Sequence, residues 1–195
     1  MYSTPVDCLT QDTIVCRDII SASEGDKIFP KRVFDVQLSC MGYIIIGLGN
    51  PGSEYENTRH NMGARMLEAF RSKHDFPAWK NDKLKRAFVS KGEVASDTAT
   101  LVFPQTFMNK SGLSAVAFIK SKKAAERTVV IYDDLDLPLG HVKISFGRSS
   151  GGHNGLESVI KGLKTKDFVR VRIGVSPTTA SAKFGNQQES KRSLI

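Results

Sequence analysis

The stretch YIIIGLGNPGSEYENTRHNMG, residues 43–63, determines the fold that we expect for this chain. Its first part, Tyr43–Leu48, is an apolar run with the length of a buried strand. The glycines and polar residues that follow predict a loop, and a stripe of apolar residues then predicts a helix over Met62–Lys73. A buried strand that leads through a loop into a helix is typical of an α/β domain.

The same alternation of strands and helices continues on the C-terminal side of this stretch. Further strands are expected over Phe88–Val94, Thr100–Phe103, Val129–Tyr132, Val142–Phe146 and Phe168–Val175. Helices are expected over Leu113–Lys122 and Leu156–Leu163. We therefore predict a single α/β domain with a mixed, mostly buried β-sheet that is flanked by helices on both faces.

The periodic pattern sets the expected boundaries of this domain. Residues 41–177 carry it, and residues 1–40 show only weak periodicity, so we expect an N-terminal extension of unknown structure there. Residues 178–195 are polar and are expected to form a disordered tail. The total of 195 residues is enough for one domain with a proper core.

Charge and cysteine content narrow the function classes. The net charge is +8, and residues 41–176 hold 21 basic and 13 acidic residues, so the excess lies in the folded part. Such an excess favours a nucleic-acid partner, although a basic surface without a specific partner stays open. The chain has no apolar stretch of ~18 residues, so no membrane span is expected. Three cysteines, all within residues 1–40, exclude a closed disulfide set and fit a reducing compartment. We expect the cytoplasm, with the mitochondrion as the alternative.

The segment GLGNPG, Gly47–Gly52, matches the G-x-G-x-x-G pattern of dinucleotide-binding loops. That function requires a helix to begin at the third glycine, so that its N-terminus faces the pyrophosphate. Here a polar stretch follows, and the next helix begins about ten residues later. We therefore favour a tight turn over a nucleotide cofactor site.

Four loops share asparagines and a histidine beside glycines, and a fifth supplies acids. The residues are Asn50, His60, Asn109 and Asn154, with Asp133, Asp134 and Asp136. A histidine is the commonest general base, a carboxylate beside it fixes its tautomer, and amide groups can stabilise an oxyanion. This set favours direct attack by an activated water molecule on an ester or amide carbonyl. The alternatives are asparagines that serve turns, Asn154 as a helix cap, and the acids as a solvated turn or a Mg²⁺ site.

A zinc site is not expected from the sequence. The chain has no CxxC pair, and its four histidines, His60, His74, His141 and His153, are scattered along the chain.

Four motifs in order resemble the bacterial-type peptidyl-tRNA hydrolases: IGLGNPGSEYENTRHNMG, FMNKSG, DDLDLPLG and GGHNGLESVI with FVRVRIGV. The resemblance covers about residues 43–177. It implies a single α/β domain that hydrolyses the ester between a peptide and the 3′ ribose of tRNA, without a metal or an organic cofactor. The implied partner is peptidyl-tRNA; no membrane and no obligate protein partner are expected, and a monomer is the default.

The resemblance also implies roles for individual residues. His60 matches the histidine that activates water, Asp133 the aspartate that keeps this histidine basic, and Asn50 the asparagine that distinguishes a blocked from a free aminoacyl group. The expected contacts to the peptide and to the tRNA end come from five residues: Tyr55, Phe107, Met108, Asn109 and Asn154.

Basic residues beside these loops are the candidates for phosphate binding. Lys143 and Arg172 are the first choice, and Arg148 and Arg170 flank the same loops. Members of the family commonly carry a second basic residue two positions after Lys143, where this chain has Ser145.

The family continues beyond RIGV with C-terminal helices that pack on the sheet, whereas a polar tail follows Pro177 here. From this difference we expect reduced stability. A non-catalytic RNA-binding protein of the same fold is the alternative function.

Overall fold

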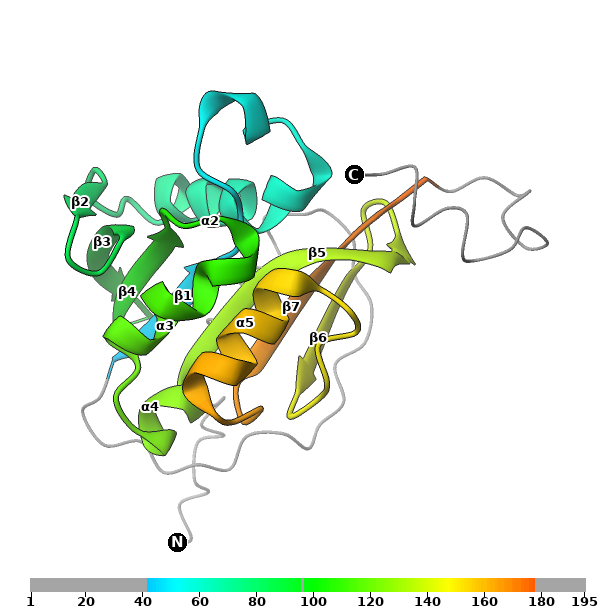
Figure 1. Ribbon diagram of the computed structural model, residues 1–195. Coiled ribbons are helices and arrows are strands. Elements are labelled where there is room, and N and C mark those ends of the chain that lie inside the picture. Colours follow the sequence, from blue (N-terminus) through cyan, green and yellow to red (C-terminus); the bar gives the residue numbers. More distant parts are fainter. Residues whose placement is uncertain (1–41, 96, 178–195) are drawn as a thin grey trace, which may run out of the picture.

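The computed structural model describes residues 42–95 and 97–177. The predictions for residues 1–40 and 178–195 therefore lie outside the described residues. The strands are β1 (Tyr43–Gly47), β2 (Lys80–Asp82), β3 (Ala87–Val94), β4 (Asp97–Pro104), β5 (Thr128–Pro138), β6 (Val142–Phe146) and β7 (Val169–Ser176). They form one seven-stranded sheet in the order β2-β3-β4-β1-β5-β7-β6 (Figure 1).

The sheet is mixed, as predicted. Strand β1 lies at its centre and pairs in parallel with β4 and β5, and β5 pairs in parallel with β7. The pairs β2–β3, β3–β4 and β6–β7 are antiparallel. The carboxyl ends of the four parallel strands consequently meet at one edge of the sheet, where ligand sites of α/β domains usually lie.

Helices cover both faces of the sheet, which confirms the predicted architecture (Figure 1). The helices are α2 (Met62–Lys73), α3 (Ser111–Phe118), α4 (Lys122–Glu126) and α5 (Asn154–Leu163), with 3-10 turns η1 (Ser53–Tyr55), η2 (Arg59–Asn61) and η3 (Met108–Lys110). Helix α2 buries Leu67 and Phe70 in the core on one face. Helices α3 and α5 bury Ala115, Leu156 and Val159 in the core on the other face. No helix in residues 42–95 or 97–177 is long and apolar enough to cross a membrane.

Two predicted segments differ from the structure in type or in continuity, beyond small differences at element ends. The acidic segment DDLDLP, expected as a loop, continues β5, because Asp134 pairs with Gly174 of β7 and, after a register shift, Pro138 pairs with Ser176. The helix expected over Leu113–Lys122 is two helices. Its chain turns extended at Ile119, and α4 then begins after a serine cap, in which the side chain of Ser121 accepts a hydrogen bond from the Ala124 amide.

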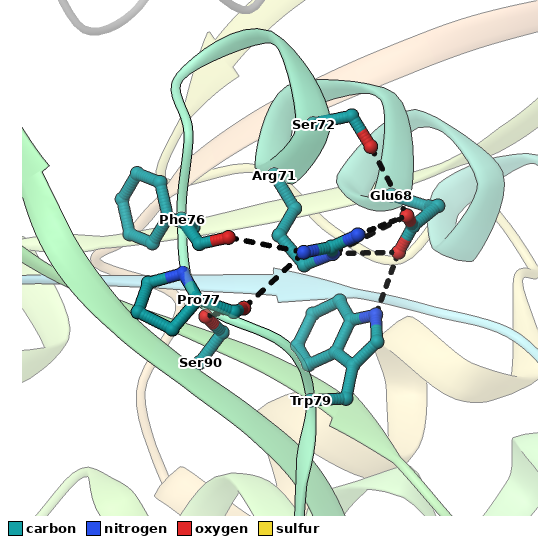
Figure 2. Close-up of polar contacts among 7 residues, drawn as sticks. All are labelled: Glu68, Arg71, Ser72, Phe76, Pro77, Trp79 and Ser90. Carbon is teal, nitrogen blue, oxygen red and sulfur yellow. Dashed lines mark hydrogen bonds and ion pairs between the residues drawn. The ribbon is translucent and has the colours of Figure 1, made fainter.

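A polar cluster fastens the segment after α2 to that helix (Figure 2). The carboxylate of Glu68 accepts hydrogen bonds from the guanidinium of Arg71, at 2.8 Å, and from the indole N–H of Trp79, at 2.6 Å. Arg71 also donates to the carbonyl oxygens of Phe76 and Pro77. The return of the chain from α2 to β2 is therefore fixed by hydrogen bonds as well as by burial of Phe76.

Candidate active site

The carboxyl edge of the sheet carries the predicted site residues. Asn50 follows β1, and the loop from Asn50 through η1 and η2 rises above the end of that strand (Figure 1). His60 lies in η2, and Asp133 lies in β5, two residues beyond Ile131, at which the pairing of β5 with β1 ends. Residues far apart in the chain thus reach one edge because β1 and β5 are parallel neighbours.

Asp133 is at the centre of the hydrogen bonding in this region. Its Oδ2 lies 2.9 Å from Nδ1 of His60, and its Oδ1 lies 3.0 Å from Nε2 of His153. The side chain of Asp133 is 1% exposed, that of His153 is 9% exposed and that of His60 is 46% exposed. A buried carboxylate therefore supports two imidazoles, of which only that of His60 reaches well into solvent.

The protonation of both rings follows from their partners. The amide of Leu156 donates to Nδ1 of His153, at 3.1 Å, so this nitrogen must be an acceptor and Nε2 carries the proton toward Asp133. Asp133 is likewise an acceptor for Nδ1–H of His60. The Nε2 atom of a neutral His60 is then left with a free lone pair, which is the form that a general base requires.

The pKa shifts of Asp133 and His60 indicate that Asp133 is ionised. Burial raises the pKa of Asp133, but hydrogen bonds from His153 and His60 outweigh it and lower the pKa to about 2. The hydrogen bond to Asp133 raises the pKa of His60, and partial burial opposes this change. Asp133 therefore remains a carboxylate at neutral pH and makes His60 a stronger base.

Asn50 is anchored from two directions. Its Oδ1 accepts a hydrogen bond from the Met108 amide at 2.7 Å. Its backbone N–H donates to Oδ1 of Asn61 at 2.8 Å, and its carbonyl accepts from Nδ2 of Asn61 at 2.9 Å. Within the described residues, no partner occupies Nδ2 of Asn50, so this group is oriented and available as a donor.

Met108 connects this loop to the start of α5. A Cβ atom built on Gly155 would collide with Sδ of Met108 and would lie 3.1 Å from Cε1 of His153. The thioether therefore packs directly on the helix that follows His153. Its backbone amide, in turn, holds Asn50.

The other predicted contact residues surround this group. Tyr55 and Phe107 form an edge-to-face pair with ring centroids 6.5 Å apart, and Phe107 is 57% exposed. Asn109 in η3 and Asn154 at the start of α5 are exposed, and no hydrogen bond joins their side chains to another described residue. They lie beside Met108 and His153 in the chain. His153, and not Asn154, caps helix α5, so the reading of Asn154 as a cap is wrong.

The basic residues predicted to bind phosphate have different surroundings. Lys143 is exposed and lies opposite Arg172 in the β6–β7 pair. Arg172 donates through Nε to Oδ2 of Asp134 at 2.5 Å, so part of its charge is neutralised. Arg170 is fully buried and donates to the carbonyl oxygens of Ser149 and Lys166, which excludes it as a surface phosphate ligand.

The sequence analysis missed His153 and Asn61. His153 was counted among scattered histidines, yet the fold brings it to the same carboxylate as His60. The only local signal was its position beside Asn154 in GGHN. Asn61 directly follows His60 and is 3% exposed, and a buried asparagine is a sign of a fixed hydrogen-bond role.

His60, Asp133 and His153 also form a group of metal-ligand types, with ligand atoms within 4.8 Å of one another. Each imidazole nitrogen faces a different oxygen of Asp133 at hydrogen-bond distance. The proton on Nε2 of His153 would have to leave before that nitrogen could bind a metal. The arrangement thus fits an acid–base site better than a metal centre.

Comparison with known proteins gives one consistent family. Residues 44–188 match the family model described as peptidyl-tRNA hydrolase. The chain is 45% identical over 134 residues to the peptidyl-tRNA hydrolase of Brevibacillus brevis (68% of this chain, 70% of the relative). It is 43% identical over 162 residues to that of Prochlorococcus marinus strain MIT 9312 (77% and 80%). The crystal structure of peptidyl-tRNA hydrolase from Acinetobacter baumannii superposes with a TM-score of 0.66 at 32% identity, covering 82% of this chain and 83% of that one. This chain, with Asp133 at the centre of its site, therefore belongs to the peptidyl-tRNA hydrolase family.

Proposed function

We propose that His60 activates the water molecule with which this peptidyl-tRNA hydrolase cleaves the ester bond between a peptide and the 3′ ribose of tRNA. The observation that carries the proposal is the contact of 2.9 Å between Nδ1 of His60 and the buried carboxylate of Asp133. This contact directs the free lone pair of Nε2 toward the open side of the site.

The reaction follows from the protonation states. Nε2 of His60 takes a proton from water as the oxygen attacks the carbonyl carbon of the ester. The imidazolium is stabilised by the ionised Asp133, and the tetrahedral intermediate carries an oxyanion. The bond between the carbonyl carbon and the ribose oxygen then breaks, and the imidazolium returns its proton to that oxygen. The products are a peptide with a free carboxyl group and a tRNA with a free 3′ end.

Asn50 is the proposed donor to the carbonyl group of the substrate. Its Oδ1 accepts a hydrogen bond from the Met108 amide, which orients the side-chain amide, and Nδ2 has no partner among the described residues. A donor that is already oriented stabilises developing negative charge without reorganisation during the reaction. The same amide would contact the last peptide unit of the substrate and so favour a blocked over a free aminoacyl group.

The remaining predicted residues form the proposed binding surface. Tyr55 and Phe107 offer aromatic edges and faces to the terminal base, since stacking on aromatic side chains is a common mode of single-strand recognition. Met108 is a wall of the site, Asn109 and Asn154 offer amides, and Lys143 and Arg172 are proposed to face phosphate groups.

The assignment is tested by release of free tRNA from N-acetylaminoacyl-tRNA. His60→Ala is expected to lower kcat by about 10³-fold or more, because the general base is lost, while tRNA binding stays near that of wild type. His141→Ala is the matched control, since His141 is an exposed histidine in the turn between β5 and β6. Wild-type turnover in His60→Ala would refute the assignment of the base, and a wild-type chain that binds tRNA without turnover would favour the non-catalytic alternative.

We further propose that the enzyme works as a monomer and without a metal or an organic cofactor, since His60 and Asp133 supply the proton transfers. Sedimentation is expected to give the mass of a monomer. Turnover is expected to stay unchanged after treatment with a chelator. The cytoplasm is the proposed compartment and the mitochondrion the alternative, which cell fractionation distinguishes.

A further inference from the structure

We propose that the turn of residues 83–86 and the start of α3 form a second RNA-binding surface, which contacts backbone phosphates of the substrate tRNA. This surface lies on the opposite side of the catalytic residues from Lys143 and Arg172. The inference rests on the proposed function, because the RNA is the tRNA of the substrate.

The segment from β2 to β3 concentrates positive charge. In seven residues it contains one acid, Asp82, and four basic residues, Lys80, Lys83, Lys85 and Arg86. Lys85 pairs with Asp82 at 3.1 Å. The other three basic side chains are exposed, and within the described residues none of them has an ion pair. Phosphate groups are the ligands expected for such a cluster.

The strand pairing brings this turn to the catalytic edge. Strand β3 is antiparallel to β4, and its first residue, Ala87, pairs with Pro104 at the carboxyl end of β4. The turn therefore lies at the same edge as His60 and Asp133. Three strand spacings separate β3 from β5, which corresponds to roughly 15 Å. An RNA strand whose 3′ end enters the site can span this distance within a few nucleotides.

The turn is held in place by its backbone. The carbonyl of Arg86 accepts hydrogen bonds from the Gln105 amide at 2.7 Å and from Oγ of Ser114 at 2.8 Å. Nζ of Lys85 lies 4.8 Å from the ring centroid of Phe118, which fastens the turn to the end of α3. Arg86 itself adopts a left-handed backbone with φ of 53°. The cationic side chains are thus presented from a fixed scaffold and not from a free loop.

Apolar and basic side chains alternate across this surface. Leu84 is 96% exposed at the tip of the turn, and Leu113 on α3 is 52% exposed. Gln105, which binds the turn, is two residues before Phe107, so the surface continues into the proposed base-stacking site. Lys110, also exposed, lies between Phe107 and Leu113 in the chain. Basic residues interleaved with exposed apolar side chains are typical of surfaces that bind phosphates together with sugars or bases.

The opposite flank has less charge available. Arg172 is paired with Asp134, and the chain has Ser145 on the same strand as Lys143. Among the residues that the structure describes, no ion pair neutralises Lys83 or Arg86. The turn therefore has more unpaired positive charge than the flank of Lys143 and Arg172.

The test is the charge-reversed double variant Lys83→Glu/Arg86→Glu. Its matched control is Lys120→Glu/Lys122→Glu, which changes the net charge equally at the opposite edge of the sheet, just before and at the start of α4. Each is assayed with N-acetylaminoacyl-tRNA and with an N-acetylaminoacyl ester of adenosine, which carries no phosphate. Binding of uncharged tRNA is measured in parallel.

We expect the turn variant to lose about tenfold in kcat/KM for the tRNA substrate and in affinity for uncharged tRNA, with kcat unchanged. The slope of log Kd against log salt should fall by about 1.5, because two phosphate contacts are lost. The adenosine ester should not respond, and the control should change little.

The proposed surface would be refuted if both double variants lost kcat/KM equally, or if the turn variant bound uncharged tRNA with wild-type affinity. An equal loss with the adenosine ester would assign the turn to the catalytic centre instead. These outcomes differ from a failure of the proposed function, in which the wild-type chain hydrolyses neither substrate. If the wild-type chain is inactive, the affinity for uncharged tRNA still tests the proposed surface.

Discussion

Nε2 of His153 lies 3.0 Å from Oδ1 of Asp133, on the carboxylate oxygen that His60 does not use. The same ring accepts the Leu156 amide at its other nitrogen and so caps α5. His153 therefore connects the orientation of Asp133 to the first turn of a helix.

This relationship predicts the behaviour of His153→Ala. Loss of one of the two hydrogen bonds would let Asp133 reorient and would raise its pKa, and His60 would lose part of its support. We expect kcat to fall by about 10- to 100-fold with KM changed less, since partners of catalytic groups commonly have effects of this size. The loss of the cap is expected to lower the free energy of unfolding by about 1 kcal/mol.

Steady-state kinetics and denaturant unfolding measure the two effects on His153→Ala. Ser121→Ala is the control for the helix cap, because Ser121 caps α4 away from the site. A stability loss with unchanged kcat would show that His153 serves the helix only.

The pKa shifts predict how activity depends on pH. His60 must be neutral to accept a proton, and its pKa is raised above 6.5 by Asp133. Activity should therefore fall as the pH drops through this raised value, so the acidic limb of kcat/KM lies above pH 6.5. Asp133→Asn removes the negative charge and should move the limb to lower pH, while kcat falls by roughly 10²- to 10⁴-fold because the tautomer is no longer fixed. A limb that stays in place in Asp133→Asn would assign it to another group.

The side chain of Asn61 makes two hydrogen bonds to the backbone of Asn50, and their removal is expected to lower both stability and activity. Asn61→Ala would leave the N–H and the carbonyl of Asn50 without their partner in a partly buried position. We expect about 1–3 kcal/mol lower free energy of unfolding. We also expect about tenfold lower kcat/KM, because the amide of Asn50 is no longer oriented. Asn57→Ala is the control, since Asn57 is an exposed asparagine of the same loop. Wild-type kinetics in Asn61→Ala would show that the hydrogen bonds between Asn61 and Asn50 do not contribute to catalysis.

The cluster around Glu68 predicts a change in stability alone. In Glu68→Gln the ion pair with Arg71 is lost, and the acceptor for the Trp79 indole is weakened. The carboxylate is about half exposed, so we expect only about 0.5–1 kcal/mol lower free energy of unfolding, with kcat unchanged. Fluorescence of Trp79, the one tryptophan of the sequence, follows the unfolding. Glu93→Gln, at an exposed position on β3, is the control and should change neither value.

Much of the fold follows from local patterns in the sequence. The apolar run at Tyr43–Leu48 is β1, and the apolar stripe over Met62–Lys73 is α2 with the predicted bounds. The pattern failed where a tertiary partner decides the structure. Asp134 lies in a strand because β7 pairs with this segment, although aspartate is depleted in strands.

The site was predictable to the extent that its residues lie in distinctive loops. His60, Asn50 and Asp133 stand beside glycines or at a strand end, where few structural roles compete. His153 escaped notice because the packing of α5 against the β5 side of the sheet, which no local pattern shows, brings it to Asp133. The same limit applies to the pairing of Arg172 with Asp134, which depends on the register between β5 and β7.

Gly155 allows a last test of how α5 is joined to the site. Alanine at an interior helix position is normally favoured over glycine by about 1 kcal/mol. At Gly155 the added Cβ would collide with Sδ of Met108 and press on His153. Since the thioether is flexible, we expect Gly155→Ala to change the free energy of unfolding by less than about 1 kcal/mol. Displacement of Met108 should nevertheless disturb the hydrogen bond to Asn50 and lower kcat/KM by about tenfold.

Gly162→Ala on the same helix is the control for Gly155→Ala. Its Cβ would meet Cγ2 of Val116 at 3.0 Å, at the end of α5 remote from His153, so kinetics should be those of wild type. Equal kinetic losses in both variants would mean that any strain in α5 reaches the site. A loss confined to Gly155→Ala would instead show that the effect passes through Met108 to Asn50. Of these two glycines, Gly155 alone would place its added methyl group against a residue that is hydrogen-bonded to Asn50.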